Sequence, residues 1–158
     1  MESIYRLRKH STIVFKDTPT ITAGAYSANE AVGGLITFTN VATTDSRGSG
    51  VIQSITIIDD AAQNAELELH LFDRTFTATT DNAAFDPTDA DLENYIGYIL
   101  VTTADYAGFV DNSAAHVSNV GLAFNLAGTS LFGQLVTRGT PTYAATDDLT
   151  IKIGVLQD

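Results

Sequence analysis

The sequence predicts an all-β fold, an antiparallel β-sandwich or jelly roll of about eight strands with one short helix near residues 88–96. Apolar and polar residues alternate along much of the chain, which is the period of a strand with one face on a core. Clusters of Gly, Asn, Asp and Ser separate these runs, as short turns do in sandwiches and jelly rolls. The chain has 158 residues, which suits a single domain of this kind.

Residues 1–20 form a basic N-terminal arm that precedes a sandwich domain over residues 21–158. The arm carries four basic and two acidic residues for a net charge of +2, which leaves −13 on the rest of a chain of net charge −11. The opposite signs predict that the arm lies on an acidic surface, which belongs to its own body, a sister subunit or a larger partner. A frayed terminus is the alternative. The basic residues are Arg6, Arg8, Lys9 and Lys16.

Residues 66–72 give the clearest strand in the first half of the chain. Leucines and polar residues alternate in this run, so a strand sorts them to opposite faces whereas a helix would scatter them. We expect the leucines to face the core and the polar residues to form a solvated outer face. The leucines are Leu67, Leu69 and Leu71, and the polar residues are Glu66, Glu68 and His70.

The remaining strands are predicted from shorter runs that are rich in β-branched and aromatic residues. They lie at 35–39, 51–58, 98–103, 120–126, 131–137 and 149–155, with weaker candidates at 12–15 and 20–22. Between them, Thr88 is a candidate N-cap because Asp91 follows three residues later and further acids lie in the first turn. That segment predicts the short helix.

Composition excludes several classes of function. The chain has no cysteine, which rules out disulfides and thiolate metal sites. Its acidity argues against binding of a nucleic-acid backbone, and no apolar run is long enough to span a membrane or to act as a secretory signal. We therefore expect no nucleic-acid or membrane partner, and synthesis in a host cytoplasm.

Motifs for catalysis or metal binding are weak, so we expect no enzyme activity, no cofactor and no metal. No two histidines have the spacing of a metal site, and the acidic run from Asp86 to Glu93 fails the calcium-loop pattern. Gly48-Ser49-Gly50 lacks the spacing of a nucleophile elbow. The strongest enzymatic alternative is a carbohydrate-active jelly roll that uses Glu66 and Glu68 as a carboxylate pair.

Three segments resemble a family of small structural proteins of tailed-phage virions, and together they span residues 20–158. The first is Tyr26-Ser27-Ala28-Asn29-Glu30-Ala31-Val32-Gly33-Gly34-Leu35. The second comprises Leu71-Phe72-Asp73, Asp81-Asn82-Ala83-Ala84-Phe85 and Asp89-Ala90-Asp91. The third comprises Thr140-Pro141-Thr142-Tyr143, Asp147-Asp148-Leu149-Thr150 and Gln157-Asp158.

The resemblance implies a jelly-roll protein of the capsid decoration, or cement, type on the exterior of a virion. Its implied partners are the major capsid protein, which it would bind at capsomer junctions, and further copies of itself in a homotrimer. The basic residues of the arm would contact the shell or a sister subunit. The alternative is a lectin-like receptor-binding module of a tail fibre or appendage, with exposed tyrosines around a groove.

Overall fold

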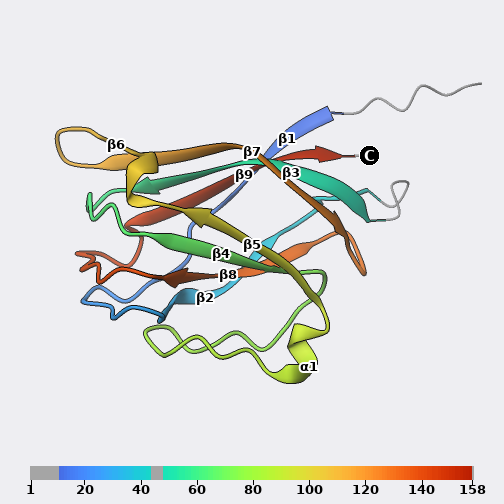
Figure 1. The fold of residues 1–158 in the computed structure, drawn as a ribbon, viewed down its shortest axis with the longest axis horizontal. Helices are drawn as coiled ribbons and strands as arrows, with labels where there is room; N and C mark the ends of the chain where they lie inside the picture. Colours follow the sequence, from blue (N-terminus) through green and yellow to red (C-terminus); the bar gives the residue numbers. More distant parts are fainter. Residues whose placement is uncertain (1–10, 44–47, 158) are drawn as a thin grey trace, which may run out of the picture.

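The computed structural model describes residues 11–43 and 48–157, which fold into two packed antiparallel sheets (Figure 1). The first sheet has the order β1 (Ser11–Asp17), β9 (Leu149–Gln157), β3 (Ser49–Asp59), β7 (Ser113–Asn125) and β6 (Tyr106–Gly108). The second has the order β2 (Ala31–Phe38), β8 (Leu131–Thr137), β4 (Leu67–Phe72) and β5 (Tyr95–Val101). The short elements are α1 (Asp89–Leu92) and the 3-10 turn η1 (Thr103–Asp105).

The order of the strands is that of a jelly roll. Without the three-residue β6, the sheets have the orders β1-β9-β3-β7 and β2-β8-β4-β5, so most successive strands lie in opposite sheets. Every pairing between neighbouring strands is antiparallel. Eight strands wound in this way make the double Greek key of a jelly roll, which confirms the predicted fold class.

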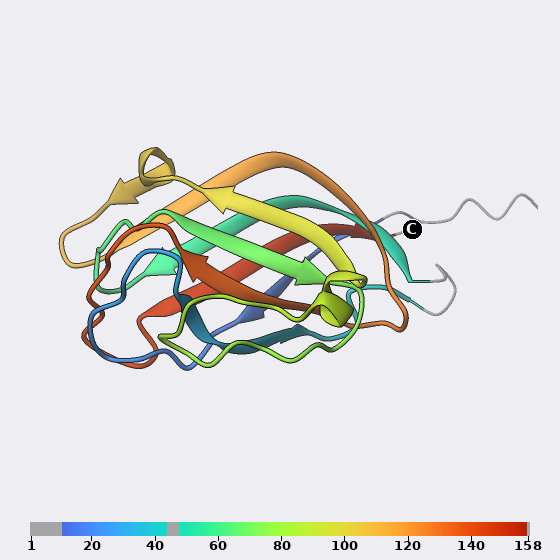
Figure 2. The ribbon, with the colours of Figure 1, turned by 60° about the horizontal axis from the view of Figure 1, so that its bottom comes forward.

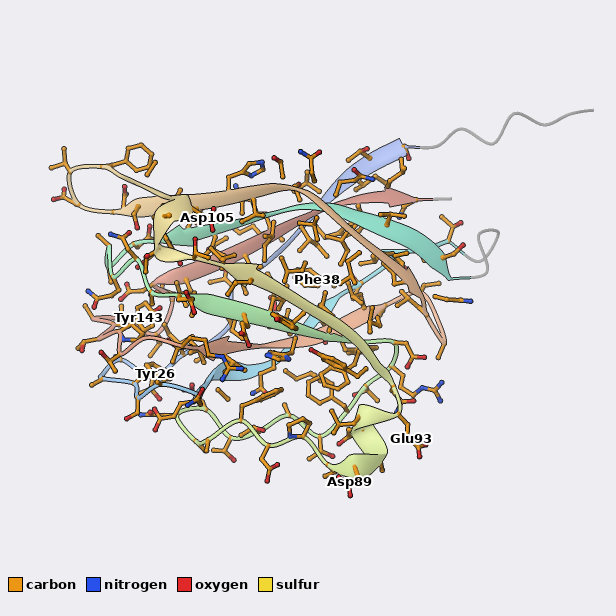
Figure 3. All side chains as sticks on the ribbon, viewed as in Figure 1. Tyr26, Phe38, Asp89, Glu93, Asp105 and Tyr143 are labelled. Carbon is orange, nitrogen blue, oxygen red and sulfur yellow. The ribbon has the colours of Figure 1, made fainter. Side chains whose placement is uncertain are left out.

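The core lies between the two sheets, where inward-facing residues of both interdigitate. On β4 the leucines at 67, 69 and 71 are fully buried, as the alternation predicts. On β9, Ile151, Ile153 and Val155 are equally buried. Phe38 of β2 lies in the space between the sheets (Figure 3). Burial of this continuous apolar layer supplies most of the driving force for the fold.

Most predicted strands are confirmed, and the exceptions are local. The candidate at residues 20–22 is not a strand, because Ile21 N–H bonds Thr146 and the Thr22 hydroxyl bonds Asp81 in a loop. The short strand β6 was not predicted. The short helix is present with Thr88 as its N-cap and Asp91 N–H as the donor, but it ends at Leu92, where 96 was expected.

The connection from β4 to α1, residues 73–88, runs along the outside of the four-stranded sheet (Figures 1 and 2). Gln134 of β8 fixes it, since its amide donates to Thr79 O at 2.6 Å and accepts from Thr79 N at 2.9 Å. Asp81 fixes it again by accepting from Tyr26 OH at 2.7 Å and from Thr22 Oγ1 at 2.6 Å. We call this segment the cover loop. Within the described residues no helix has the length and apolar character needed to cross a membrane.

Candidate functional site

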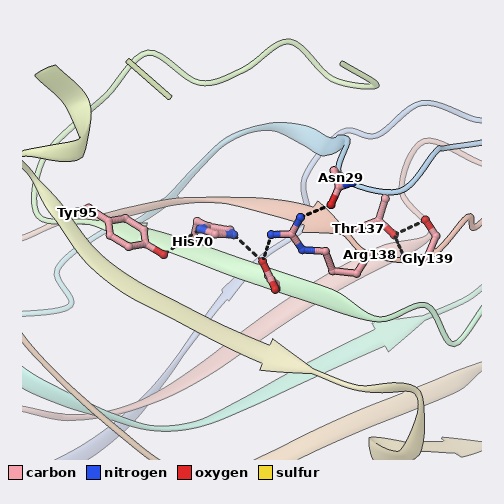
Figure 4. A network of polar contacts seen from close by, with 7 residues as sticks. Asn29, His70, Tyr95, Thr137, Arg138 and Gly139 are labelled. Carbon is pink, nitrogen blue, oxygen red and sulfur yellow. Dashed lines mark hydrogen bonds and ion pairs between the residues drawn. The ribbon is translucent and has the colours of Figure 1, made fainter. Parts of the chain in front are cut away.

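The titratable cluster on the outer face of β4 is the strongest candidate site. Inward-facing leucines leave Glu68 and His70 on the opposite face of the same strand. Glu68 Oε2 accepts from Arg138 Nη2 at 2.7 Å and from His70 Nε2 at 2.9 Å. His70 Nδ1 contacts the Tyr95 hydroxyl at 3.0 Å, and Arg138 Nη1 donates to Asn29 (Figure 4). The cluster therefore joins four separate segments of the chain.

Aromatic rings enclose the imidazole of His70. The ring centroid of Phe85, from the cover loop, lies 4.7 Å from that of His70. The rings of Tyr95 and Tyr98 from β5 stack at 5.8 Å and 5.5 Å. His70 is in consequence only 9% exposed. The solvated outer face predicted for β4 is thus wrong at His70, because the cover loop shields it from water.

Burial and hydrogen bonding shift the pKa values in this cluster. Burial lowers the pKa of His70 and outweighs the opposite effect of Glu68. Burial alone would raise the pKa of Glu68, but the hydrogen bonds from Arg138 and His70 outweigh it and hold that pKa below its usual value. Burial raises the pKa of Tyr95 to about 12. The cluster therefore contains an ionised Glu68 and a neutral His70 at pH 7.

These protonation states fix the direction of the hydrogen bonds. An ionised carboxylate only accepts, so His70 Nε2 carries the proton that bonds Glu68. Nδ1 of the neutral ring is then an acceptor, and Tyr95 OH donates to it. Both ring nitrogens are engaged and one ring face is covered by Phe85. The geometry suits a positioning network that locks the cover loop onto the sheet, and it leaves His70 no free nitrogen for proton transfer to a substrate.

The carboxylates at 66 and 68 have different surroundings, and Glu68 is not among the residues that line the hollow beside Glu66. Glu66 lines a shallow, open hollow of about 390 Å³, whereas Glu68 is held by Arg138 and His70. A glycosidase pair needs both carboxylates on either side of a bound sugar. The structure gives the carboxylate-pair hypothesis no support. The hollow is lined by Gln63, Asn64, Ala65, Glu66, Thr103, Arg138, Gly139, Thr140 and Pro141.

Two aspartates, Asp59 and Asp148, accept hydrogen bonds from loop backbone N–H groups at the end of the sheet where β3 ends and β9 begins. The Asp59 carboxylate, fully buried, accepts from Ala61 N at 3.1 Å and Asn64 N at 2.9 Å. Asp148 Oδ2 accepts from Ala144 N and Ala145 N. Burial raises the pKa of Asp59. Over residues 11–43 and 48–157, no three acidic or histidine side chains group as metal ligands would.

The four basic residues predicted to bind a partner are divided by the limits of the structure. Arg6, Arg8 and Lys9 lie outside the described residues. Lys16 is exposed on β1. This strand falls within the predicted arm and is an edge strand of the five-stranded sheet. The cross-strand neighbour of Lys16 is Lys152 of β9. Like charges directly opposite one another are unfavourable in a sheet, so this pair suits an anionic neighbour.

Comparison with known proteins adds little to this description. No family model matches the chain, and no curated protein does. A chain of the solved structure of Desmodium yellow mottle tymovirus is similar, with 14% identity, a match over 94% of this chain and 82% of that one, and a TM-score of 0.26. A TM-score that low does not establish a shared fold, so the jelly-roll assignment depends on the strand order alone.

Proposed function

We propose that this chain is a non-enzymatic structural protein of a phage particle that decorates and stabilises the capsid exterior. It would bind the major capsid protein where capsomers meet. The jelly-roll strand order carries the proposal, because viral capsid domains, lectins and cupins are the main users of that architecture. Fold alone does not fix function, so the other features of this chain must distinguish among capsid proteins, lectins and cupins.

The cupin alternative requires metal ligands inside the sandwich. The described part of the chain offers no such group, and the inward faces of β4 and β9 carry only aliphatic side chains at their centres. The titratable residues His70 and Glu68 lie on the outer face under the cover loop. These features favour a structural role over a cupin. The resemblance of three sequence segments to structural proteins of tailed phages favours a role in a virion.

Charge suits a protein that assembles onto a large surface after it folds. A body of net charge −13 keeps the free protein soluble, while the arm of net charge +2 supplies the attractive contact. A shell offers many identical sites, so weak contacts add by avidity when several copies associate. Arg6, Arg8, Lys9 and Lys16 are the proposed contact residues.

Co-sedimentation with capsids that lack the protein tests this proposal. The full chain should bind and saturate at a stoichiometry set by shell symmetry. A variant with Arg6, Arg8 and Lys9 changed to Ala keeps the chain length and leaves β1 intact, and it should bind at least tenfold more weakly. Absence of saturable binding by the full chain would overturn the decoration proposal.

A receptor-binding module of a tail fibre or appendage is the second candidate. One observation favours it. Tyr98 of β5 is 53% exposed, and its ring stacks on His70, which shares Glu68 with Arg138 at the lining of the polar hollow. An exposed ring beside polar side chains is a common sugar platform. Saturable glycan binding that Tyr98→Ala abolishes would support this candidate over the first.

A further inference from the structure

The outer face of the five-stranded sheet is uncovered and carries no acidic residue on its strands. Figure 1 shows this sheet as the upper layer with no described segment above it, whereas the cover loop lies outside the other sheet. Within the five strands the only acids are Asp17 and Asp59. They stand opposite the buried residues Ile151 and Leu149, so both lie on the core side. A chain with 19 acidic residues thus keeps them off the outward positions of these strands.

Both lysines of the described residues lie on this face, in one row across four strands. Lys16 of β1 stands directly opposite Lys152 of β9. Lys152 stands opposite Thr56 of β3, and Thr56 stands opposite His116 of β7. Residues that are paired across strands project to the same side of a sheet, and Ile151 and its alternate neighbours take the core side. The row therefore presents two ammonium groups beside a hydroxyl and an imidazole, whose Oγ1 and Nδ1 atoms lie 2.9 Å apart.

The two lysines are the lysine and arginine side chains without an ion-pair partner in residues 11–43 and 48–157. Arg74 and Arg138 each pair with a carboxylate, at 3.0 Å and 2.7 Å. Asp17 follows the first lysine directly, but it lies on the core side and accepts from Thr18 N at 3.0 Å. Along β3 the next acid on the outer side is Asp60, four residues beyond the row and about 13 Å away. The row thus has no carboxylate of its own chain beside it on this side of the strands.

We propose that the outer face of the five-stranded sheet binds an acidic surface of a protein partner, with a partner carboxylate seated between Lys16 and Lys152. Like charges opposite one another are unfavourable, so a carboxylate between them removes a repulsion and adds two charge-assisted contacts. The identification of this partner as the capsid shell rests on the proposed function. The carboxylate chemistry rests only on the row itself.

A protein surface fits this face better than a nucleic acid or a lipid headgroup layer. A phosphate backbone is typically held by about 6–10 basic contacts and a lipid surface by about 4–8 lysines and arginines, far more than two. The outward positions beside the lysines carry hydroxyl groups and the aliphatic residues Val14, Ile58 and Leu156. Such a mixture is typical of protein interfaces.

The size of the face predicts a weak contact for a single copy. Four strands span about 14 Å and β1 runs for about 23 Å, which is less than half of the roughly 800 Å² that each partner buries in a stable interface. Several copies on one partner would therefore bind by avidity. Salt should weaken the contact, because both lysines are at the surface.

Titration of the full chain with the peptide hexaglutamate, followed by amide chemical shifts, tests the carboxylate chemistry without a capsid. At low salt the shifts should saturate at millimolar peptide and be largest at the four residues of the row. Arg74, an exposed arginine of the cover loop that already has an ion-pair partner, should shift at least fourfold less. Shifts as large at Arg74, the absence of saturable shifts, or larger shifts in the row with hexathymidylate would overturn the proposal.

Charge reversal tests the shell as the partner, by co-sedimentation with capsids that lack the protein. Lys16→Glu and Lys152→Glu should each bind at least tenfold more weakly than the unchanged chain, and Lys16→Arg should retain binding. Arg74→Glu is the matched control, because it changes the net charge equally in the cover loop, and it should bind within twofold of the unchanged chain. Each lysine reversal sets opposite charges face to face on neighbouring strands, so its melting temperature should not fall.

The outcomes separate this inference from the proposed function. If the unchanged chain binds capsids and the lysine reversals bind as well as Arg74→Glu, this face does not meet the shell and the inference is overturned. If the unchanged chain does not bind capsids, the decoration proposal fails. The peptide titration then decides whether the face binds carboxylates.

Discussion

Replacing Glu68 with leucine tests whether the polar cluster stabilises the fold. Glu68 Oε2 is shared by Arg138 Nη2 and His70 Nε2. Leucine is close in volume but accepts no hydrogen bond, so both donors lose this partner at once. Arg138 keeps its contact with Asn29 and access to water, whereas the Nε2–H of His70 is left in a buried setting.

The magnitude follows from the different exposure of the two donors. An unsatisfied buried donor costs about 1–3 kcal/mol, which applies to His70. The Arg138 side chain is 34% exposed, so water replaces much of the lost ion pair and this loss adds at most about 1 kcal/mol. Together these losses should lower the free energy of unfolding by about 1–4 kcal/mol. For a chain of this length the melting temperature should drop by about 2–16 °C.

Urea unfolding followed by circular dichroism measures the change, and Glu66→Leu is the matched control. Glu66 lies two residues earlier on the same side of the chain, and its carboxylate has no hydrogen-bond partner among the described residues. Glu66→Leu should change the free energy of unfolding by no more than about 0.5 kcal/mol. If the two variants lose the same stability, or Glu68→Leu loses less than about 0.5 kcal/mol, the reasoning is refuted.

Three further predictions concern the same framework. The folded pKa of His70 lies below its usual 6.5, so between pH 6.5 and the folded pKa the unfolded chain binds a proton that the folded chain does not. The free energy of unfolding should therefore decline as the pH falls through this window, by at most about 1.4 kcal/mol per pH unit. His70→Phe should flatten this part of a plot of urea midpoint against pH. Leu69→Ala removes a fully buried side chain from a central strand, and calorimetry should show a loss of about 2–5 kcal/mol, with a loss below about 1 kcal/mol contradicting the core assignment. Asp81→Ala removes the acceptor for Tyr26, Thr22 and Gly33 N–H, so unfolding should cost roughly 2–4 kcal/mol less and limited proteolysis should cleave the cover loop faster; unchanged cleavage would show that other contacts hold the loop.

Strands with strict alternation were predictable from the sequence, because burial of one face imposes a period of two. Residues 131–137 match β8 at both ends, and the leucines of residues 66–72 face the core as expected. The N-cap at Thr88 was predictable because capping depends on residues three apart. The candidate at 20–22 has strand-forming residues but no partner strand, and contacts with Asp81 and Thr146 decide its conformation.

The polar cluster could be predicted only in part. Alternation places Glu68 and His70 on one face, but it does not say what covers that face. The cover is Phe85, which is distant in sequence. It reaches His70 because Gln134, Asp81 and backbone hydrogen bonds to Asn29 and Ala31 hold the loop down. Tyr95 and Arg138 had no spacing that linked them to β4. Long-range packing of this kind leaves no local sequence signal.

A reconstruction of the intact phage particle by electron cryo-microscopy tests the central claim most directly. The account predicts jelly-roll density on the outer surface of the capsid, at positions where capsomers meet, that accommodates residues 11–157. The density should disappear from particles assembled without this chain. Its absence from the capsid exterior, or its presence on a tail fibre instead, would contradict the proposed function.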